Sequence, residues 1–84
     1  MVPGTERVQR GVRGGTVRYA IVAADLTETG RDKLLPVLDG RGIPFVVRYD
    51  RVELGRAVGR SPLAAVGVTD RGFADRLAAL LGNG

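Results

Sequence analysis

The chain has 84 residues, with 13 basic and nine acidic side chains that give a net charge of +4, and it contains neither cysteine nor histidine. A chain of this length forms one small domain, here spanning 1–84, and without these two residue types it has no disulfide, no thiolate or imidazole metal ligand and no Ser–His–Asp or Cys–His catalytic arrangement. No apolar run approaches the roughly 20 residues of a membrane helix or resembles a signal peptide, so we expect a cytoplasmic protein with no membrane partner.

The first predicted element is a helix within the opening segment "VPGTERVQRGVRGG". Thr5 is expected to cap this helix, and Val8 and Val12, four residues apart, are expected to face the core. Arg7 and Arg10 follow at a spacing of three residues. Such arginines are either a solvated helix face or one wall of a site for a negatively charged partner.

Three apolar runs, "VRYAIVAAD", "GIPFVVRY" and "LAAVGVTD", predict strands. Because their apolar residues do not alternate strictly with polar ones, we expect both faces to be buried, as in a parallel-type sheet covered by helices. A helix is predicted after each strand, so the order is one helix followed by three strand–helix units. This order predicts a three-layer α/β/α sandwich.

The second predicted helix, in "TETGRDKLLPVLDGRG", is capped by Thr27 or Thr29 and ends at residues 40–42. Pro36 lacks a backbone donor, so we expect a kink or break near Leu34. Asp50 is expected to cap the third helix, "RVELGRAVG", which would bury one apolar stripe. In the stripe of that helix and in the last helix, "DRGFADRLAALL", the predicted buried residues are Val52, Leu54, Val58, Phe73, Leu77, Leu80 and Leu81.

The basic residues are concentrated in two blocks. Residues 1–18 and residues 41–60 each sum to +3, whereas the rest of the chain sums to −2. Two basic blocks that are separate in the sequence are what a polyanion site assembled by folding requires. Lys33 and Arg31, beside several acidic residues, are interpreted as an ordinary mixed-charge surface.

Motifs for chemistry are absent. "GVRGG" precedes a strand and lacks the dinucleotide-binding spacing, and "VGRSPL" lacks the glycine–lysine pair of a phosphate-binding loop. Asp25 and Asp70 both follow strands, where paired carboxylates hold a metal in some proteins, although aspartate at a strand end is more often a helix cap. We therefore predict no catalytic residues, no metal site and no cofactor, and hence no enzyme.

Five blocks, "VPGTERVQRGVRGG", "YAIVAAD", "GIPFVV", "ELGRAVGR" and "AAVGVTDRGFADRL", resemble in order and spacing the kink-turn RNA-binding ribosomal protein superfamily of archaeal L-seven-Ae and eukaryotic L-thirty-e. The last block is most similar to its bacterial, YlxQ-like branch. The resemblance covers nearly the whole chain. It implies an α/β/α sandwich, no catalysis and binding to sharply bent RNA.

The resemblance also implies where RNA would bind. The family's contacts come from the start of the glycine–threonine helix and from the loop after the leucine–glycine helix. The matching residues here are Gly4, Thr5, Glu6, Arg7, Arg10, Arg60, Ser61, Pro62 and Leu63. These two places coincide with the two basic blocks. A helix N-terminus suits a phosphate, and Pro62 and Leu63 could stack on an unpaired base.

The chain departs from the archaeal pattern, which has asparagine, glutamate and lysine at the positions of Glu6, Arg7 and Arg10. An amide donates and accepts hydrogen bonds whereas an ionised carboxylate only accepts, so general RNA binding is better supported than recognition of a standard kink-turn. Family members carry a further helix upstream of this start, so the chain is expected to be a truncation or to have a late-assigned start. We expect apolar surface left open near Val8, Val12 and the last helix, which would promote self-association.

Two hypotheses follow. The first is a non-catalytic domain that binds structured RNA, kink-turn-like or ribosomal. The alternative is a protein–protein interaction module that keeps the sandwich and has lost RNA binding, which Glu6 and Arg7 favour.

Overall fold

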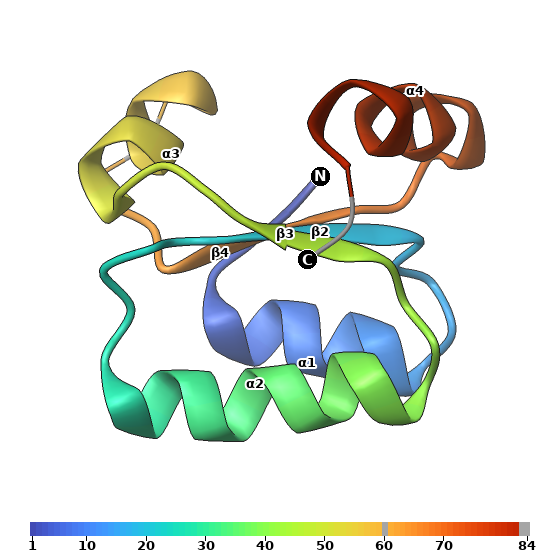
Figure 1. Cartoon of the computed structure of the whole chain (residues 1–84), viewed down its shortest axis with the longest axis horizontal. Helices are drawn as coiled ribbons and strands as arrows, with labels where there is room; N and C mark the ends of the chain where they lie inside the picture. The colour runs from blue at the N-terminus through green and yellow to red at the C-terminus, as the bar shows by residue number, and fades with distance from the viewer. Residues whose placement is uncertain (60, 83–84) are drawn as a thin grey trace.

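The computed structural model describes residues 1–59 and 61–82 as four helices and four strands. The elements are β1 (Val2–Pro3), α1 (Thr5–Arg13), β2 (Tyr19–Val22), α2 (Glu28–Gly40), β3 (Phe45–Val47), α3 (Arg51–Ala57), β4 (Ala65–Val68) and α4 (Arg71–Leu81). Helices α1 and α2 lie on one face of the sheet, and α3 and α4 lie on the other (Figure 1). The predicted three-layer α/β/α sandwich is therefore confirmed.

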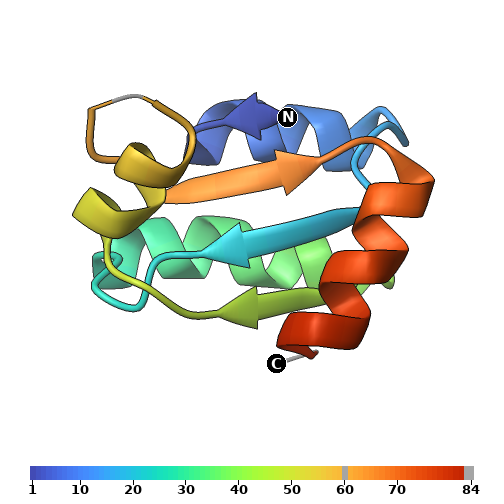
Figure 2. The same cartoon turned by 90° about the horizontal axis from the view of Figure 1, so that it is seen from above.

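The sheet is mixed, which differs from the expected parallel type. The strand order is β1-β4-β2-β3, with β2 and β3 parallel and β4 antiparallel to β2, as the arrowheads in Figure 2 show. Strand β1, antiparallel to β4, was not predicted because two residues are too short to show a pattern. Because β2 and β4 are antiparallel, their carboxyl ends lie at opposite ends of the sheet.

Each face of the sheet has its own apolar core. On the α1–α2 side the buried residues are Val8, Val12, Val17, Ala20, Val22, Leu34, Leu38 and Ala65. On the α3–α4 side they are Tyr19, Ile21, Ala23, Val46, Leu54, Val68 and Ala74. Successive residues of β2 belong to alternate cores, because side chains alternate between the faces of a strand. This is the physical reason for the continuous apolar runs in the sequence.

The surface expected to lie open near Val8 and Val12 is closed, and that expectation was wrong. Val8 is 0% exposed and Val12 is 2% exposed, because α2 packs against α1 on this face. On the other face the outcome is mixed. Leu54 is buried and Phe73, Leu77 and Leu81 are partly buried, as expected.

Two of the predicted buried residues are instead exposed. Val52 is 50% exposed and Leu80 is 78% exposed, although the sequence pattern placed both in the core. In Figure 1, helices α3 and α4 stand apart above the sheet, and neither helix covers the flank of the other. The open surface is therefore confined to the α3–α4 side.

The helix ends follow side-chain chemistry with one exception. Thr27 caps α2 by accepting from Gly30 N at 3.2 Å, and Asp50 forms a capping box with Glu53 at the start of α3. Thr5 does not cap α1; the N-cap is Gly4, which has φ 94° and no side-chain cap bond. The chain leaves β1 at Pro3 and turns at once, and glycine adopts the positive φ of that turn without strain.

Pro36 does not break its helix. Helix α2 runs without interruption over Glu28–Gly40 with Pro36 inside it, so the expected break near Leu34 was wrong. A proline at this position removes the hydrogen bond to the carbonyl of Asp32, four residues earlier. Both Pro36 and Asp32 are exposed, so water can satisfy that carbonyl.

The C-terminal end of α4 is attached to the sheet through a buried phenol. The hydroxyl of Tyr19, in β2, donates to the carbonyl of Gly82 at 2.7 Å. Burial, with a smaller effect from Tyr49, raises the pKa of Tyr19 above 10.0. Among residues 1–59 and 61–82, no helix is both long and apolar enough to cross a membrane.

Candidate nucleic-acid interface

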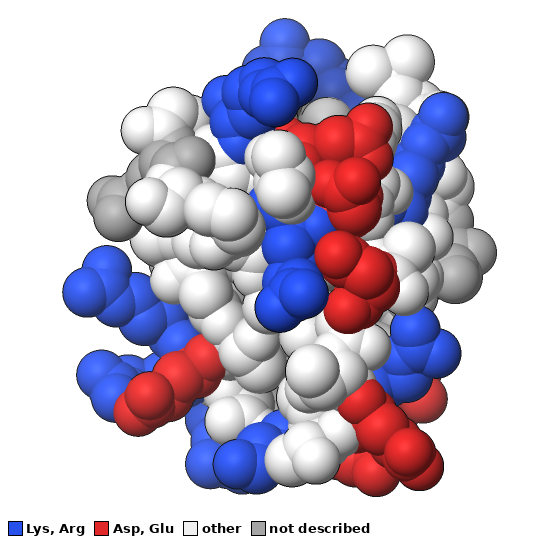
Figure 3. All heavy atoms as spheres, turned by 90° about the vertical axis from the view of Figure 1, so that its left-hand side faces the viewer, with Lys and Arg blue, Asp and Glu red and all other residues white. Residues whose placement is uncertain are grey.

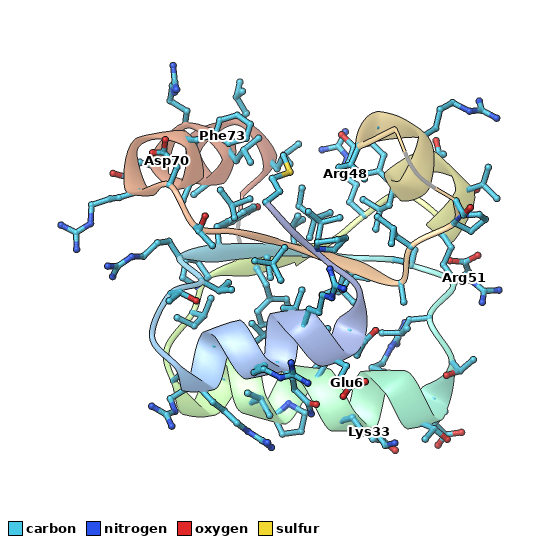
Figure 4. All side chains as sticks on the ribbon, turned by 180° about the vertical axis from the view of Figure 1, so that it is seen from behind. Glu6, Lys33, Arg48, Arg51, Asp70 and Phe73 are labelled. Carbon is cyan, nitrogen blue, oxygen red and sulfur yellow. The ribbon has the colours of Figure 1, made fainter. Side chains whose placement is uncertain are left out.

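A polar groove of about 570 Å³ lies where the N-terminal ends of α1, α2 and α3 meet. It is lined by Thr5, Glu6, Gln9, Leu26, Thr27, Thr29, Gly30, Lys33, Arg51 and Ala64. In Figure 4, Glu6 on α1 and Lys33 on α2 lie at the same end of the helical layer, and Arg51 lies at the sheet edge on that side. We call this the polar groove.

Of the two segments predicted to contact RNA, the start of α1 lines this groove, whereas Ser61, Pro62 and Leu63 do not, and Leu63 packs against the core on the α3–α4 side. Thr5 and Glu6 line it directly, and Gly4 N donates to Ala65 O at 2.8 Å. Ala64, which follows Leu63 in the chain, lines the groove as well. The start of α1 and the loop before β4 are therefore adjacent, although about sixty residues separate them in the sequence. Sheet pairing between β1 and β4 produces this adjacency.

Of the acidic and basic residues predicted at the start of α1, Glu6 lines the groove and Arg7 and Arg10 do not. Arg10 Nη2 donates to Glu6 Oε1 at 3.3 Å, with both side chains more than three-quarters exposed. Such an exposed i, i+4 pair adds little stability and opens readily. Arg7 is exposed and free to meet a phosphate outside the groove.

The loop before β4 is anchored to α3 on the side next to the groove. Ser61 and Pro62 are exposed, Leu63 is half-buried, and Leu63 N donates to Arg51 O at 2.9 Å. A Cβ added to Gly55 of α3 would lie within 3 Å of backbone atoms of Ser61 and Pro62. The backbone of the loop therefore crosses α3 in close contact at Gly55. Arg60, also predicted to contact RNA, lies outside the described residues.

Sequence reasoning missed several polar residues of the groove. Lys33 was assigned to an ordinary surface, yet it lines the groove, and its carbonyl accepts from Gln9 Nε2 at 2.6 Å. Arg51 belongs to the second basic block, and its backbone N and Nε both donate to Asp25, at 3.0 and 3.4 Å. The signal that could have identified Lys33 is its spacing from Thr29, one helical turn earlier on the same face.

The surrounding surface carries both signs of charge. Figure 3 shows acidic side chains in a band down the face on the left of Figure 1, with basic side chains on both sides of the band. This face is therefore not uniformly basic. An anion that approaches this face meets individual charges of both signs and not a broad positive field.

Of the two aspartates weighed as metal ligands, only Asp70 is a helix N-cap, because the N-caps of α2 and α3 are Thr27 and Asp50. Asp25 accepts from the first backbone N of α3, and Asp70 accepts from Phe73 N at 3.2 Å at the start of α4. They lie at opposite ends of the sheet, because each follows its strand and β4 is antiparallel to β2. In the described part of the chain, no three His, Cys, Asp or Glu side chains gather closely enough to hold a metal ion.

Comparison with known proteins identifies relatives over almost the whole length. A model of the ribosomal protein L7Ae/L30e/S12e/Gadd45 family matches residues 1–78. The RNA-binding protein YlxQ of Bacillus subtilis is 27% identical over 81 residues, which is 96% of this chain and 81% of YlxQ. The solved structure of a protein with unknown function from Bacillus halodurans is 37% identical, with a TM-score of 0.89 over 94% of this chain and 80% of that chain.

Proposed function

The chain belongs to the ribosomal protein L7Ae/L30e/S12e/Gadd45 family, and from this premise we propose that it is a single-domain, non-catalytic protein that binds structured RNA. Similarity to YlxQ, an RNA-binding protein, supports the same partner. The observation that carries the proposal is that the start of α1, one of the two segments that the resemblance names, lines a polar groove. The other named segment ends at Leu63, next to Ala64, which also lines that groove.

The polar groove and the loop beside it together offer the two kinds of contact that RNA recognition needs. Backbone N–H groups at the start of α1 and the side chains of Lys33 and Arg51 suit phosphate oxygens. Pro62 and Leu63 lie on the neighbouring loop and not in the groove lining; Pro62 is exposed and Leu63 is half-buried against the α3–α4 core, and together they offer an apolar surface to an unstacked base. Phosphate contacts in a groove and a stacking surface on the next loop fit a bent strand better than a straight duplex. We therefore propose a kink-turn-like, ribosome-associated RNA in the cytoplasm as the partner.

Filter binding tests this proposal with a kink-turn RNA and a straight duplex of equal length, each titrated over a range of salt concentrations. We expect tighter binding of the bent RNA, and a log–log salt slope of roughly −0.7 to −0.9 for each neutralised phosphate. Arg10→Ala should weaken binding to both RNAs equally and flatten the slope by about one contact. Arg71→Ala, which removes an exposed arginine at the opposite end of the sheet, is the matched control: it lowers the net charge by the same unit, and Arg10→Ala should weaken binding and flatten the slope more than it does.

A second candidate function is a protein-interaction module on the same fold. The Glu6–Arg10 ion pair favours it, because a carboxylate in the groove repels phosphate and occupies a guanidinium. The same titration separates the two. A salt slope near zero, with equal affinity for bent and straight RNA, contradicts RNA binding and leaves the interaction module.

A further inference from the structure

Asp25 is bonded through both carboxylate oxygens to a single residue, Arg51. Its Oδ1 accepts from the backbone N of Arg51 at 3.0 Å, and its Oδ2 accepts from the side-chain Nε at 3.4 Å. Asp25 is not the N-cap of either neighbouring helix, because Thr27 and Asp50 occupy those positions. The RNA contacts proposed above leave this carboxylate without a role.

Sheet pairing brings Asp25 and Arg51 together, although 26 positions separate them in the sequence. Strands β2 and β3 are parallel neighbours, so the chain leaves both strands at the same end of the sheet. The pairing continues past the strand ends, where Ala24 N donates to Tyr49 O at 2.7 Å. Asp25, the next residue, is therefore held beside the first turn of α3.

The backbone of Arg51 is fixed on two sides. Its N–H donates to Asp25, and its carbonyl accepts from Leu63 N at 2.9 Å, which attaches α3 to the loop before β4. The other carboxylates at this helix start bind backbone groups: Asp50 Oδ1 accepts from Glu53 N at 2.7 Å, and Glu53 Oε1 accepts from Asp50 N at 2.9 Å. Among the described residues, the ion pair of the Arg51 guanidinium is thus with Asp25.

The contact at Nε leaves the outer edge of the Arg51 guanidinium available. A guanidinium has five N–H donors, one on Nε and four on the two Nη atoms. Asp25 accepts from Nε, and within the described residues neither Nη atom donates a hydrogen bond. Arg51 lines the polar groove, at the end of the molecule where Figure 4 also shows Glu6 and Lys33, and its side chain is 49% exposed. Two parallel N–H groups of this kind bind a phosphate through two of its oxygens.

The second ion pair of the described chain, between Glu6 and Arg10, differs in geometry. Glu6 Oε1 contacts Arg10 at Nη2, on the edge of the guanidinium that would meet a phosphate, and both side chains are more than three-quarters exposed. Asp25 instead contacts the base of its guanidinium and is 46% exposed. The Glu6 carboxylate therefore competes with a phosphate, whereas Asp25 leaves the phosphate-binding edge open.

On these grounds we propose that Asp25 is a positioning residue for RNA binding, which holds the Arg51 guanidinium at the polar groove with its Nη atoms left for a backbone phosphate. This role rests on the proposed RNA function and extends it to an acidic residue, whose charge alone would repel RNA. A long side chain that is already ordered in the free protein loses less conformational entropy on binding. This gain exceeds the repulsion between Asp25 and the phosphate, because solvent and salt screen a half-exposed carboxylate.

Asp25→Asn tests the role, because the amide keeps an oxygen for Arg51 N but loses the charge that holds Nε. In filter binding we expect about three- to tenfold weaker affinity for the kink-turn RNA, the cost of ordering one long side chain during binding. Asp75→Asn is the matched control, because it removes the same charge at an exposed position of α4 that does not line the polar groove. It should tighten binding slightly, so the two variants should have effects of opposite sign.

Arg51→Ala separates positioning from a structural role of Asp25. This variant keeps the backbone N–H that donates to Asp25 and removes the guanidinium. In the Arg51→Ala background, Asp25→Asn should therefore no longer weaken binding and should tighten it slightly, as Asp75→Asn does. Weakening of the same size in both backgrounds overturns the proposal, because Asp25 then acts through the backbone of α3.

Heteronuclear NMR of the wild type without RNA tests the contact directly and needs no variant to fold. The Nε–H of Arg51 should exchange with water more slowly than that of Arg13, an exposed arginine that forms no ion pair with another described residue. Equal exchange rates overturn the proposal. If the wild type binds RNA and Asp25→Asn tightens that binding, the positioning role is wrong and the RNA function stands. A wild type that binds no RNA refutes the RNA function, and the positioning role fails with it.

Discussion

The polar groove and the groove between α3 and α4, which we call the apolar groove, have similar volumes, about 570 and 660 Å³, but opposite chemistry. The polar groove is bounded by helix N-termini, threonines, Lys33 and Arg51. The apolar groove is bounded by helix flanks that carry leucines and aromatic rings. A hollow of a given size therefore says little about its partner, whereas the groups on its walls distinguish an RNA strand from a protein surface.

The two grooves differ because the two helical layers differ. Helices α1 and α2 pack against each other, and Gln9 of α1 bonds to the Lys33 carbonyl of α2, so their layer closes over its core. Helices α3 and α4 each pack on the sheet and leave Ile21 at the floor of the space between them. The polar groove thus lies at the edge of the closed layer formed by α1 and α2. The apolar groove is an opening between α3 and α4, which we call the open layer.

The largest test of this comparison replaces a leucine in each layer by alanine. Leu34 is 0% exposed in the closed layer, so Leu34→Ala should lower the free energy of unfolding by about 2–5 kcal/mol. Leu80 is 78% exposed in the open layer, so Leu80→Ala should change the stability of the monomer by less than about 0.5 kcal/mol. Urea denaturation of dilute samples measures both. Equal losses would mean that the open layer is packed in solution.

The helices and strands of both layers were largely predictable from the sequence, and the exposure of residues in the open layer was not. The spacing of Val8 and Val12, the cap at Thr27 in the closed layer, the cap at Asp50 in the open layer and the apolar runs all reflect local rules of helix and strand formation. Leu80 fits the same helical pattern as Leu77 and Leu81, yet it faces outward. Whether a residue on an apolar stripe is covered depends on a neighbouring element, and local periodicity contains no information about that element.

The polar groove was predictable in its segments and not in its full set of residues. The family resemblance named Glu6 and Leu63, which the structure brings to one end of the sheet. The resemblance did not name Lys33, because it points only to the start of α1 and the loop before β4. Helix α2 lies at the groove as a result of its packing against α1. The antiparallel direction of β4 was equally hidden, since an apolar run such as "LAAVGVTD" reads the same for either direction. That direction separates Asp25 from Asp70.

The next test concerns the loop that borders the polar groove. Gly55→Ala would place a Cβ against the carbonyl oxygen of Ser61, closer than van der Waals contact allows, so the loop or α3 must shift. We expect a loss of about 1–3 kcal/mol in stability and a weaker affinity for RNA. Gly40→Ala is the matched control, because its Cβ would meet nothing within 4 Å at the end of α2. A Gly55→Ala variant with wild-type melting temperature and affinity would show that this close approach does not position the loop.

The proposed stacking edge is tested by Leu63→Ala. If an unpaired base lies on Leu63, the change should weaken binding of kinked RNA by about 1–3 kcal/mol and leave the straight duplex almost unaffected. Leu80→Ala serves as the control, since it removes a leucine from the apolar groove and should not alter RNA affinity. Equal weakening for both RNAs would assign Leu63 to loop stability instead of base contact, and filter binding with both RNAs measures the difference.

A smaller effect is expected where α4 is attached to the sheet. Tyr19→Phe removes the hydrogen bond to Gly82 O and should cost about 0.5–1.5 kcal/mol at neutral pH. The pKa of Tyr19 is raised by burial, so above pH 10 the unfolded chain ionises first and stability falls as pH rises through the folded pKa. Tyr19→Phe should therefore lose less stability than wild type in this range. Melting curves from pH 8 upward measure this, and Tyr49→Phe, at a more exposed phenol, should behave like wild type.

The smallest expected effect, and the one that most directly tests the chemistry of the polar groove, is at Glu6. This carboxylate lines the groove, is 85% exposed and pairs with Arg10 at 3.3 Å. If it repels phosphate, Glu6→Asn should tighten RNA binding by about two- to fivefold, a range typical of an exposed charge interaction. The amide also restores a donor beside an acceptor, so the preference for a standard kink-turn should sharpen.

Net charge alone would produce part of this effect, and Asp75→Asn controls for it. Asp75 is an exposed residue of α4 that lines neither groove, and Asp75→Asn raises the net charge by one unit, as Glu6→Asn does. Tightening by Glu6→Asn beyond that of Asp75→Asn is therefore local to the groove. Weaker binding after Glu6→Asn would instead mean that the carboxylate accepts a hydrogen bond from a base amino group of a different RNA. If Glu6→Asn, Arg10→Ala and Leu63→Ala all leave RNA affinity unchanged, RNA binds neither at the start of α1 nor at the loop before β4, and the interaction-module alternative replaces the RNA proposal.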